Sequence, residues 1–376
     1  MALSDLWRRP TSKPRSRVLP ARGRAVVLSD LHGHHGDWTA FLAASRVLER
    51  IADGEDVWLL ITGDTPDVAR HRAVDPTVPE DGDVQILDEL LRARAALGPR
   101  AERSVYLEGN HDFHVLRICR EVCRWHAAQQ GRPLPGPDFV PEVTGDEIDA
   151  YFDYYREAYG EAVFANNISP YDMVRRARPD HLRLFEQSPV VAHLEGAGVV
   201  VTHAGPPRMS GLRADAVRRE VDRCDREWMR TAPPEAYYRA LYHQLLNSRF
   251  RNGDYSLEDL RAFLAAFDSG VLVTGHTPHP YLVDFERKAP LEGCAFREGL
   301  GLIGDHQVVL CSSFGAFDAS LKRYLDLDLS RRHRTVDDLF QEAGDAVRPI
   351  HPDRAPRADD GAAPALPGLE LLLDEG

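Results

Sequence analysis

Five short apolar runs along the chain each end in a metal-ligating side chain beside glycine, and this recurrence most restricts the possible folds. Runs of this length predict buried strands. Because α/β sheets bind ligands beyond the C-terminal ends of their strands, the pattern predicts one shared site. The runs and the motifs after them are 25–28 before Asp30-Leu31-His32-Gly33, 57–61 before Gly63-Asp64-Thr65-Pro66-Asp67, 105–107 before Gly109-Asn110-His111-Asp112, 199–201 before His203-Ala204-Gly205, and 271–273 before Gly275-His276-Thr277.

These motifs supply nitrogen and oxygen ligands, which suit two divalent ions of the Mn, Fe or Zn kind. Asp64 is the expected bridging carboxylate, because Gly63 before it lets the backbone approach closely. Two ions about 4 Å apart make water attack a phosphorus ester. The six expected ligands are Asp30 and His32 for one ion, Asn110, His203 and His276 for the other, and Asp64 between them.

His111 directly follows Asn110, and adjacent side chains diverge. We therefore expect His111 to face the substrate and to act as the general acid that protonates the leaving oxygen. Asp67 is expected to orient its imidazole. A purely structural His–Asp pair is the alternative.

The charge balance of the chain restricts its partners. The 376 residues carry a net charge of −13, although the first 24 hold seven basic residues and one acidic residue. Phosphate contacts dominate sequence-independent nucleic-acid binding, so the acidic body disfavours a nucleic-acid partner, while the basic arm leaves RNA open. A metal-lined cleft still accepts phosphates, because bound cations reverse the local sign.

Cysteine usage and hydropathy predict a cytoplasmic protein without a membrane partner. The chain has five cysteines, an odd and small number that does not form a disulfide framework. We find no stretch as long as a membrane-spanning helix, and the basic N-terminus lacks the apolar core of a secretory signal.

Cys119, Cys123 and His126 share one face of a predicted helix, which is one possible arrangement for zinc ligands. Apolar neighbours on the same helix favour a buried face instead. His34 and His35 follow the first motif, and we expect them to be loop residues near the cleft rather than ligands.

The expected organisation is a flexible basic arm at 1–24, one domain at 25–330 and a Pro/Ala-rich tail at 345–376. Two mostly helical insertions, 115–190 and 206–268, should lie over or beside the strand ends. Helical patterns occur at 37–50, 83–97, 111–127, 146–160, 177–187, 211–229, 234–247 and 257–267. Further strands are expected at 281–285, 307–312 and 321–327.

As a set, the five motifs resemble the calcineurin-like metallophosphoesterase superfamily, and most of all its branch of phosphoprotein (Ser/Thr) phosphatases and symmetrical diadenosine tetraphosphatases. The segments 185–189, 310–315 and 324–329 are also similar to that branch. The resemblance covers roughly 24–330. It implies an α/β fold, a four-layer α/β/β/α sandwich of two mixed sheets, with a binuclear site at the strand ends. It also implies a phosphatase that hydrolyses phosphate monoesters with a metal-bridging hydroxide, with Mn as the expected ion in vitro.

The sequence departs from that branch where an arginine normally grips the substrate phosphate. Val68-Ala69 stand there in place of Arg-Gly. Arg70 or Arg72 could take over this role, since an arginine fork binds phosphate bidentately, or could face solvent. In the same branch an arginine in the region of Arg249 and Arg251 contacts phosphate, with a solvated turn as the alternative.

Two further features bear on the branch and the substrate. Pro278, two residues after His276, occupies a position where other branches have another ligand histidine. His279 lies one residue beyond that position. This supports the phosphoprotein-phosphatase-like branch. The long helical region between Gly109 and His203 implies a restricted or unusual substrate.

The expected partner is a phosphorylated protein or small molecule. Dinucleoside polyphosphates and nucleic-acid phosphate ends are the alternative substrates, since the motif set is shared. A non-enzymatic scaffold is disfavoured, because none of the six ligand positions is missing.

Overall fold

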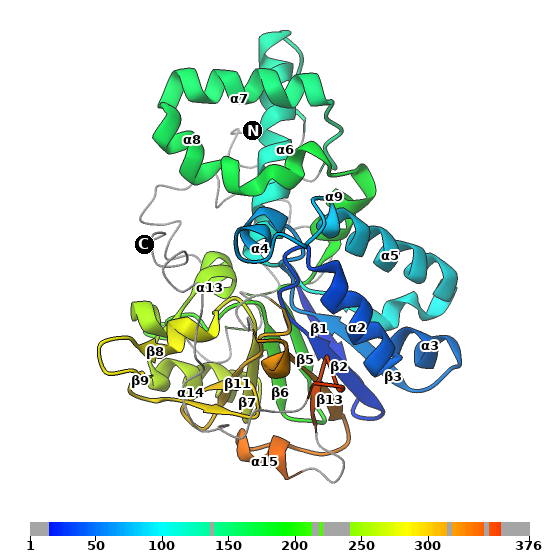
Figure 1. Cartoon of the computed structure of the whole chain (residues 1–376), viewed down its shortest axis with the longest axis vertical. Coiled ribbons are helices and arrows are strands. Elements are labelled where there is room, and N and C mark those ends of the chain that lie inside the picture. The colour runs from blue at the N-terminus through cyan, green and yellow to red at the C-terminus, as the bar shows by residue number, and fades with distance from the viewer. Residues whose placement is uncertain are drawn as a thin grey trace.

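Two mixed β-sheets pack face to face at the centre of the molecule, as the computed structural model shows (Figure 1). The structure describes residues 15–135, 139–212, 217, 219, 221, 241–313, 318–341 and 346–354. The side chains of Arg70, Val74 and Ser169 lie outside this description. Among the helices it includes, none has both the length and the apolar character needed to cross a membrane.

The smaller sheet brings the first three motifs to one edge. Its strands run in the order β14 (Val347–Pro349), β13 (Arg323–Asp328), β2 (Arg24–Leu28), β3 (Val57–Ile61) and β4 (Ser104–Tyr106). β2, β3 and β4 are parallel. Their C-terminal ends therefore lie on the same side, where the motifs of Asp30, Asp64 and Asn110 follow.

The larger sheet contributes the last two motifs. Its strands run in the order β1 (Ser16–Leu19), β5 (Val191–Leu194), β6 (Val199–Thr202), β7 (Val271–Thr274), β12 (Gln307–Val309), β11 (Leu300–Ile303) and β10 (Cys294–Arg297). β6 and β7 are adjacent and parallel, so His203 and His276 emerge side by side.

Apolar residues on both faces of the strands create the layers. Adjacent residues of a strand point to opposite faces. Val27 packs into the core between the two sheets, while Val26 packs under Trp38 and other helical residues. The larger sheet is covered on its outer face by a third cluster that includes Phe263. These clusters confirm the predicted four-layer sandwich.

Helices cover the outer face of each sheet (Figure 1). On the smaller sheet these are α2 (His35–Ser45), α3 (Val47–Ala52) and α5 (Gly82–Leu97), and on the larger sheet α13 (Leu241–Asn247) and α14 (Leu257–Ala266). The remaining short elements are α4 (Val68–Val74), η1 (Gly98–Arg103), η3 (Phe250–Asn252), η4 (His279–Leu282), β8 (Val283–Asp284), β9 (Ala289–Pro290), η5 (Ala319–Leu321) and α15 (Asp337–Phe340).

A helical cap stands over the strand ends (Figure 1). It consists of α6 (Asn110–Gln129), α7 (Gly145–Tyr159), α8 (Glu161–Asn167), η2 (Ser169–Arg175) and α9 (Pro179–Gln187). A capping box of Thr144 and Glu147 starts α7. Arg120 of α6 pairs with Glu186 of α9 at 2.5 Å, which fixes the two ends of the cap together.

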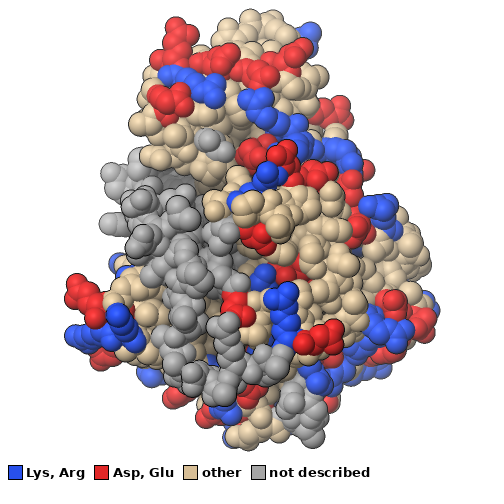
Figure 2. Space-filling model, viewed as in Figure 1, with Lys and Arg blue, Asp and Glu red and all other residues tan. Residues whose placement is uncertain are grey.

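The visible face of the cap is charged. Figure 2 shows acidic side chains along the top of this view, over α7, with basic side chains interspersed below them. On this face, acidic and basic side chains of the described residues lie side by side.

The predicted boundaries at both ends of the domain were wrong. Residues 16–19, which we expected in a flexible arm, form β1, because this segment completes the edge of the larger sheet beside β5. Arg15 is buried and donates to the carbonyls of Glu186 and Ser188. At the other end, β14 pairs with β13, so the domain extends beyond residue 330. Residues 1–14 and 355–376 lie outside the described residues, as does most of the helix predicted at 211–229.

Candidate metal centre

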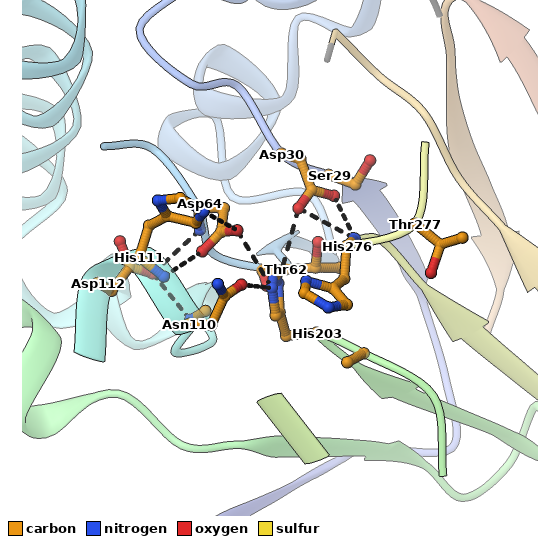
Figure 3. Close-up of polar contacts among 12 residues, drawn as sticks. Ser29, Asp30, Thr62, Asp64, Asn110, His111, Asp112, His203, His276 and Thr277 are labelled. Atoms are coloured by element: carbon orange, nitrogen blue, oxygen red, sulfur yellow. Dashed lines mark hydrogen bonds and ion pairs between the residues drawn. The ribbon is translucent and has the colours of Figure 1, made fainter. Parts of the chain in front are cut away.

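The five motifs meet at the strand ends in one buried cluster (Figure 3). The six predicted ligands form a connected set, because each lies close to another member. The separations are 3.8 Å for His32–Asp64, 3.2 Å for His203–Asp64, 2.9 Å for His203–Asn110 and 3.7 Å for His203–Asp30, and the backbone N–H of His276 donates to Asp30. His276 is partly buried, and the other five are buried.

Asp64 lies at the centre of this cluster. Three imidazoles turn their Nε2 atoms toward its Oδ2 atom, at 3.8 Å for His32, 3.9 Å for His111 and 3.2 Å for His203. Its Oδ1 atom accepts a hydrogen bond from the backbone N–H of His111. The carboxylate is therefore fixed by the backbone on one side and faces imidazoles on the other.

The opposite nitrogen, Nδ1, of each imidazole is held by an oxygen atom. The partners are the Pro66 carbonyl for His32 at 2.9 Å, the Thr62 carbonyl for His203 at 2.9 Å and Oδ2 of Asp67 for His111 at 3.4 Å. A carbonyl can only accept, so Nδ1 of His32 and Nδ1 of His203 each carry a proton. With Nδ1 held in this way, Nε2 of His32 and of His203 can act as a metal ligand once it is deprotonated, so the donor set fits metal binding.

Two groups of side chains share Asp64 as a common member. One comprises Asp64, His32 and His111, and the other comprises Asp64, His203 and His276. Within each group the potential ligand atoms lie within 4.8 Å of one another. This arrangement matches a site for two ions with a shared carboxylate. Asp30 and Asn110 both contact His203, on the side of the second group.

The backbone of the site is strained. Of the eight non-glycine residues with positive φ among those described, four belong to the five motifs. Their φ angles are 40° for His32, 52° for Asp64, 78° for Asp67 and 60° for His276. Such conformations cost about 1–3 kcal/mol each and persist only where surrounding contacts fix them. Here they turn each chain sharply after its strand, which directs the side chains into the cluster.

Two glycines allow the carboxylates to approach the neighbouring turns. A Cβ atom on Gly275 would lie 1.8 Å from Oδ2 of Asp30, and one on Gly109 would lie 2.1 Å from Oδ1 of Asp64. Glycine is therefore required at both positions because a Cβ atom would overlap the neighbouring carboxylate, and not because the chain must be flexible there.

Without a bound cation, the charges of the cluster oppose one another. Burial raises the pKa of Asp30 to about 7, and the charge of Asp64 adds to this effect. Burial lowers the pKa of His203, but the neighbouring Asp64 outweighs it and raises the pKa to about 9. A proton on His203 thus compensates the carboxylates in the position where a cation would do so.

Asp112 supports the site and was not predicted to have a role. Its carboxylate accepts hydrogen bonds from the backbone N–H groups of Asp64 at 3.0 Å and Gly109 at 2.8 Å, and from the Tyr106 hydroxyl at 2.8 Å. It therefore fastens the second motif to the third. The signal in the sequence was its position three residues after Gly109 at the start of a helix, since an acidic residue at this position caps the first turn.

Of the arginines predicted to bind phosphate, Arg249 lies beside the cluster. Its guanidinium contacts the carbonyl of His276 at 3.5 Å and stacks over Tyr281. Arg251 is exposed and donates to the Val283 carbonyl instead. Arg72 pairs with Glu80 at 2.9 Å. The side chain of Arg70 lies outside the described residues.

The other singled-out residues lie apart from the cluster. Cys119 is buried in the apolar core, and the Cys123 thiol contacts the Glu142 carbonyl, which supports the buried-helix interpretation over zinc. His35 pairs with Glu89. His279 is buried against Phe296, and burial lowers its pKa to about 4.

Replacement of Gly275 by alanine tests whether the close approach at Asp30 builds a metal site. The added Cβ would overlap the carboxylate, so Asp30 or the His276 turn must move. We expect Mn²⁺ affinity, measured by isothermal titration calorimetry, to fall by about 10-fold or more. Gly145→Ala is the matched control, because its Cβ would meet no atom within 4 Å. Equal affinity of both variants would contradict the prediction.

Comparison with known proteins assigns the family. Residues 23–280 match the family model of the calcineurin-like phosphoesterases. No curated protein matches the chain significantly. Among solved structures, a protein serine/threonine phosphatase from Saccharomyces cerevisiae is 14% identical, with 86% of this chain and 79% of that chain covered and a TM-score of 0.44. A cold-active protein-tyrosine phosphatase from a Shewanella species is also 14% identical, with 84% and 78% covered and a TM-score of 0.40.

These structural likenesses are too distant to carry an argument about substrate. The family model, in contrast, spans more than half of the chain and includes all five motifs. It confirms the superfamily expected from the motifs. The chain therefore belongs to the calcineurin-like phosphoesterase family and is a phosphoric ester hydrolase.

Proposed function

We propose that this protein is a phosphatase that hydrolyses phosphate monoesters with two divalent ions bound on either side of Asp64. The observation that carries the proposal is the convergence of three imidazole Nε2 atoms on one carboxylate oxygen, at 3.2–3.9 Å. Metal-ligating histidines share this arrangement, since one ring nitrogen faces the ion while the other is held by an oxygen acceptor.

The residues proposed to hold the ions are Asp30, His32, Asp64, Asn110, His203 and His276. When bound, divalent ions supply an activated water and neutralise charge on the phosphoryl oxygens. The chain itself provides the orientation. The carbonyls of Pro66 and Thr62 fix the rings of His32 and His203, and Asp112 fixes the backbone of Asp64.

His111 is proposed to be the general acid. Oδ2 of Asp67 lies 3.4 Å from its Nδ1 atom, so the carboxylate orients the ring and stabilises its protonated form. The Nε2 atom then faces the cluster, 3.9 Å from Oδ2 of Asp64, where the oxygens of a bound phosphate would lie. From this position it can give a proton to the leaving oxygen.

Arg249 is proposed to grip the substrate phosphate. Val68, which stands where related phosphatases have an arginine, is buried against Gly33 and cannot do so. The guanidinium of Arg249 adjoins the His276 turn, and its planar fork suits a phosphate with two free oxygens. A monoester offers those oxygens to the arginine as well as to the ions.

The proposed substrate is a phosphorylated protein or small molecule, and Mn²⁺ is the proposed ion in vitro. A cytoplasmic location is also proposed, supported by the four described cysteines, which are all free.

Chelation and a substrate panel test the proposal. We expect the protein to hydrolyse p-nitrophenyl phosphate and a phosphoserine peptide, to lose this activity in EDTA, and to regain it with Mn²⁺, since the cluster supplies no other source of an activated water. The panel should include bis-p-nitrophenyl phosphate and diadenosine tetraphosphate. Activity that survives thorough chelation, or cleavage of the diester or the tetraphosphate in preference to monoesters, would overturn the proposal.

Arg249→Ala tests the role of the guanidinium. We expect kcat/KM for p-nitrophenyl phosphate to fall by about 10²-fold, because a charged donor to the transferred group is removed. Arg251→Ala is the matched control, since Arg251 follows closely in sequence but is exposed, and its kcat/KM should stay near that of the wild type. The assignment is wrong if both variants lose activity to the same extent.

A further inference from the structure

The helical cap brings an aromatic ring against the proposed general acid. The ring centroid of Tyr171 lies 5.3 Å from that of His111, with an interplanar angle of 52°. The same ring lies 4.7 Å from His114, tilted by 32°. Tyr171 belongs to η2, which is 60 residues beyond His111 in the chain and follows the α7–α8 helices. The contact therefore exists only because the cap folds back over the strand ends.

The backbone holds this ring in place. Tyr171 interrupts η2 with φ −105° and ψ 45°, and its N–H donates to the carbonyl of Ile168 at 3.0 Å. Two of the next three residues, Met173 and Val174, are buried in the core. Arg176 then pairs with Asp83 of α5 at 3.0 Å, which ties the segment to the body of the protein. The ring is thus presented by a segment that is anchored on both sides.

Several groups surround the His111 imidazole, among them Asp64, whose Oδ2 atom lies 3.9 Å from Nε2. Asp67 lies 3.4 Å from its Nδ1 atom, and the His32 ring meets it edge-on with centroids 5.0 Å apart. Tyr171 approaches from the cap. The Asp67 contact fixes one atom of the imidazole but leaves the ring able to rotate about that contact. A neighbouring ring removes this freedom, so the position of the Nε2 atom depends on Tyr171 as well.

We propose that Tyr171 is a positioning residue, which fixes the His111 ring for proton transfer to the leaving group. This inference rests on the function proposed above. In that reaction a water oxygen bonds to phosphorus, the bond from phosphorus to the leaving oxygen breaks, and Nε2 of His111 gives that oxygen a proton. A proton lost by the attacking water restores the imidazolium. A displaced His111 ring slows this step most where the leaving oxygen is basic and needs the proton.

Two substrates of similar shape test the inference in the Mn²⁺-loaded full-length protein. Phenyl phosphate has a basic leaving group, and p-nitrophenyl phosphate has an acidic one. We expect Tyr171→Ala to lower kcat for phenyl phosphate by about 10-fold or more and to leave kcat for p-nitrophenyl phosphate nearly unchanged. Tyr171→Phe keeps the ring and should behave as the wild type. Tyr171→Leu fills the space without a ring and serves as a second test if the alanine variant folds poorly. It should also lower kcat for phenyl phosphate and leave kcat for p-nitrophenyl phosphate nearly unchanged.

Two controls separate positioning from general destabilisation. Tyr154 belongs to the same cap, and its ring is 38% exposed and stacks on Trp125. Tyr154→Ala should therefore leave kcat unchanged for both substrates. In a His111→Asn background, Tyr171→Ala should have little further effect, because the two residues act through one step.

If Tyr171→Ala lowers kcat equally for both substrates, the inference is overturned and the proposed function stays intact. The same holds if the losses of kcat caused by Tyr171→Ala and His111→Asn add up in the double variant. A wild-type protein that hydrolyses neither substrate with Mn²⁺ would overturn the proposed function, and this inference with it.

Discussion

The buried carboxylate of Asp64 and the imidazoles around it are the constraint on which the rest of the structure depends. A carboxylate that is removed from water needs compensating charge. The chain provides this only in part, since three Nε2 atoms face Oδ2 while their opposite nitrogens are held by oxygen acceptors or a second carboxylate. A cation bound between these atoms, as proposed above, would complete the compensation. Folding and metal binding would then be coupled at this point.

The sandwich architecture makes this arrangement possible. Each sheet ends in parallel strands on the same side, so motifs far apart in the sequence meet at one edge. The strained turns after the strands and the close approach at Gly109 and Gly275 then bring the side chains nearer than ordinary loops allow. The cost of this strain is offset by the cores on both sides of each sheet. The cap adds a wall above the edge and contributes Tyr171.

Much of the fold could be predicted because strand runs and motifs alternate in a regular way. The predicted helices at 83–97 and 146–160 match α5 and α7 to within a residue at each end, because their apolar spacing and start signals are clear. The strands β1 and β14 were missed, since such short edge strands are defined by pairing with β5 and β13 rather than by their own composition. The sequence predicted that the ligand side chains lie close together, because the strand order brings the motifs to one edge. It did not predict the roles of Asp112 and Tyr171. Both depend on contacts across motifs, which no local pattern encodes.

Anomalous diffraction from crystals of the protein soaked in Mn²⁺ tests the central claim most directly, because it locates the ions without reference to activity. The account predicts two peaks per chain, about 3.5–4 Å apart, with the carboxylate of Asp64 in contact with both. A single peak, or two peaks that do not share Asp64, would contradict it.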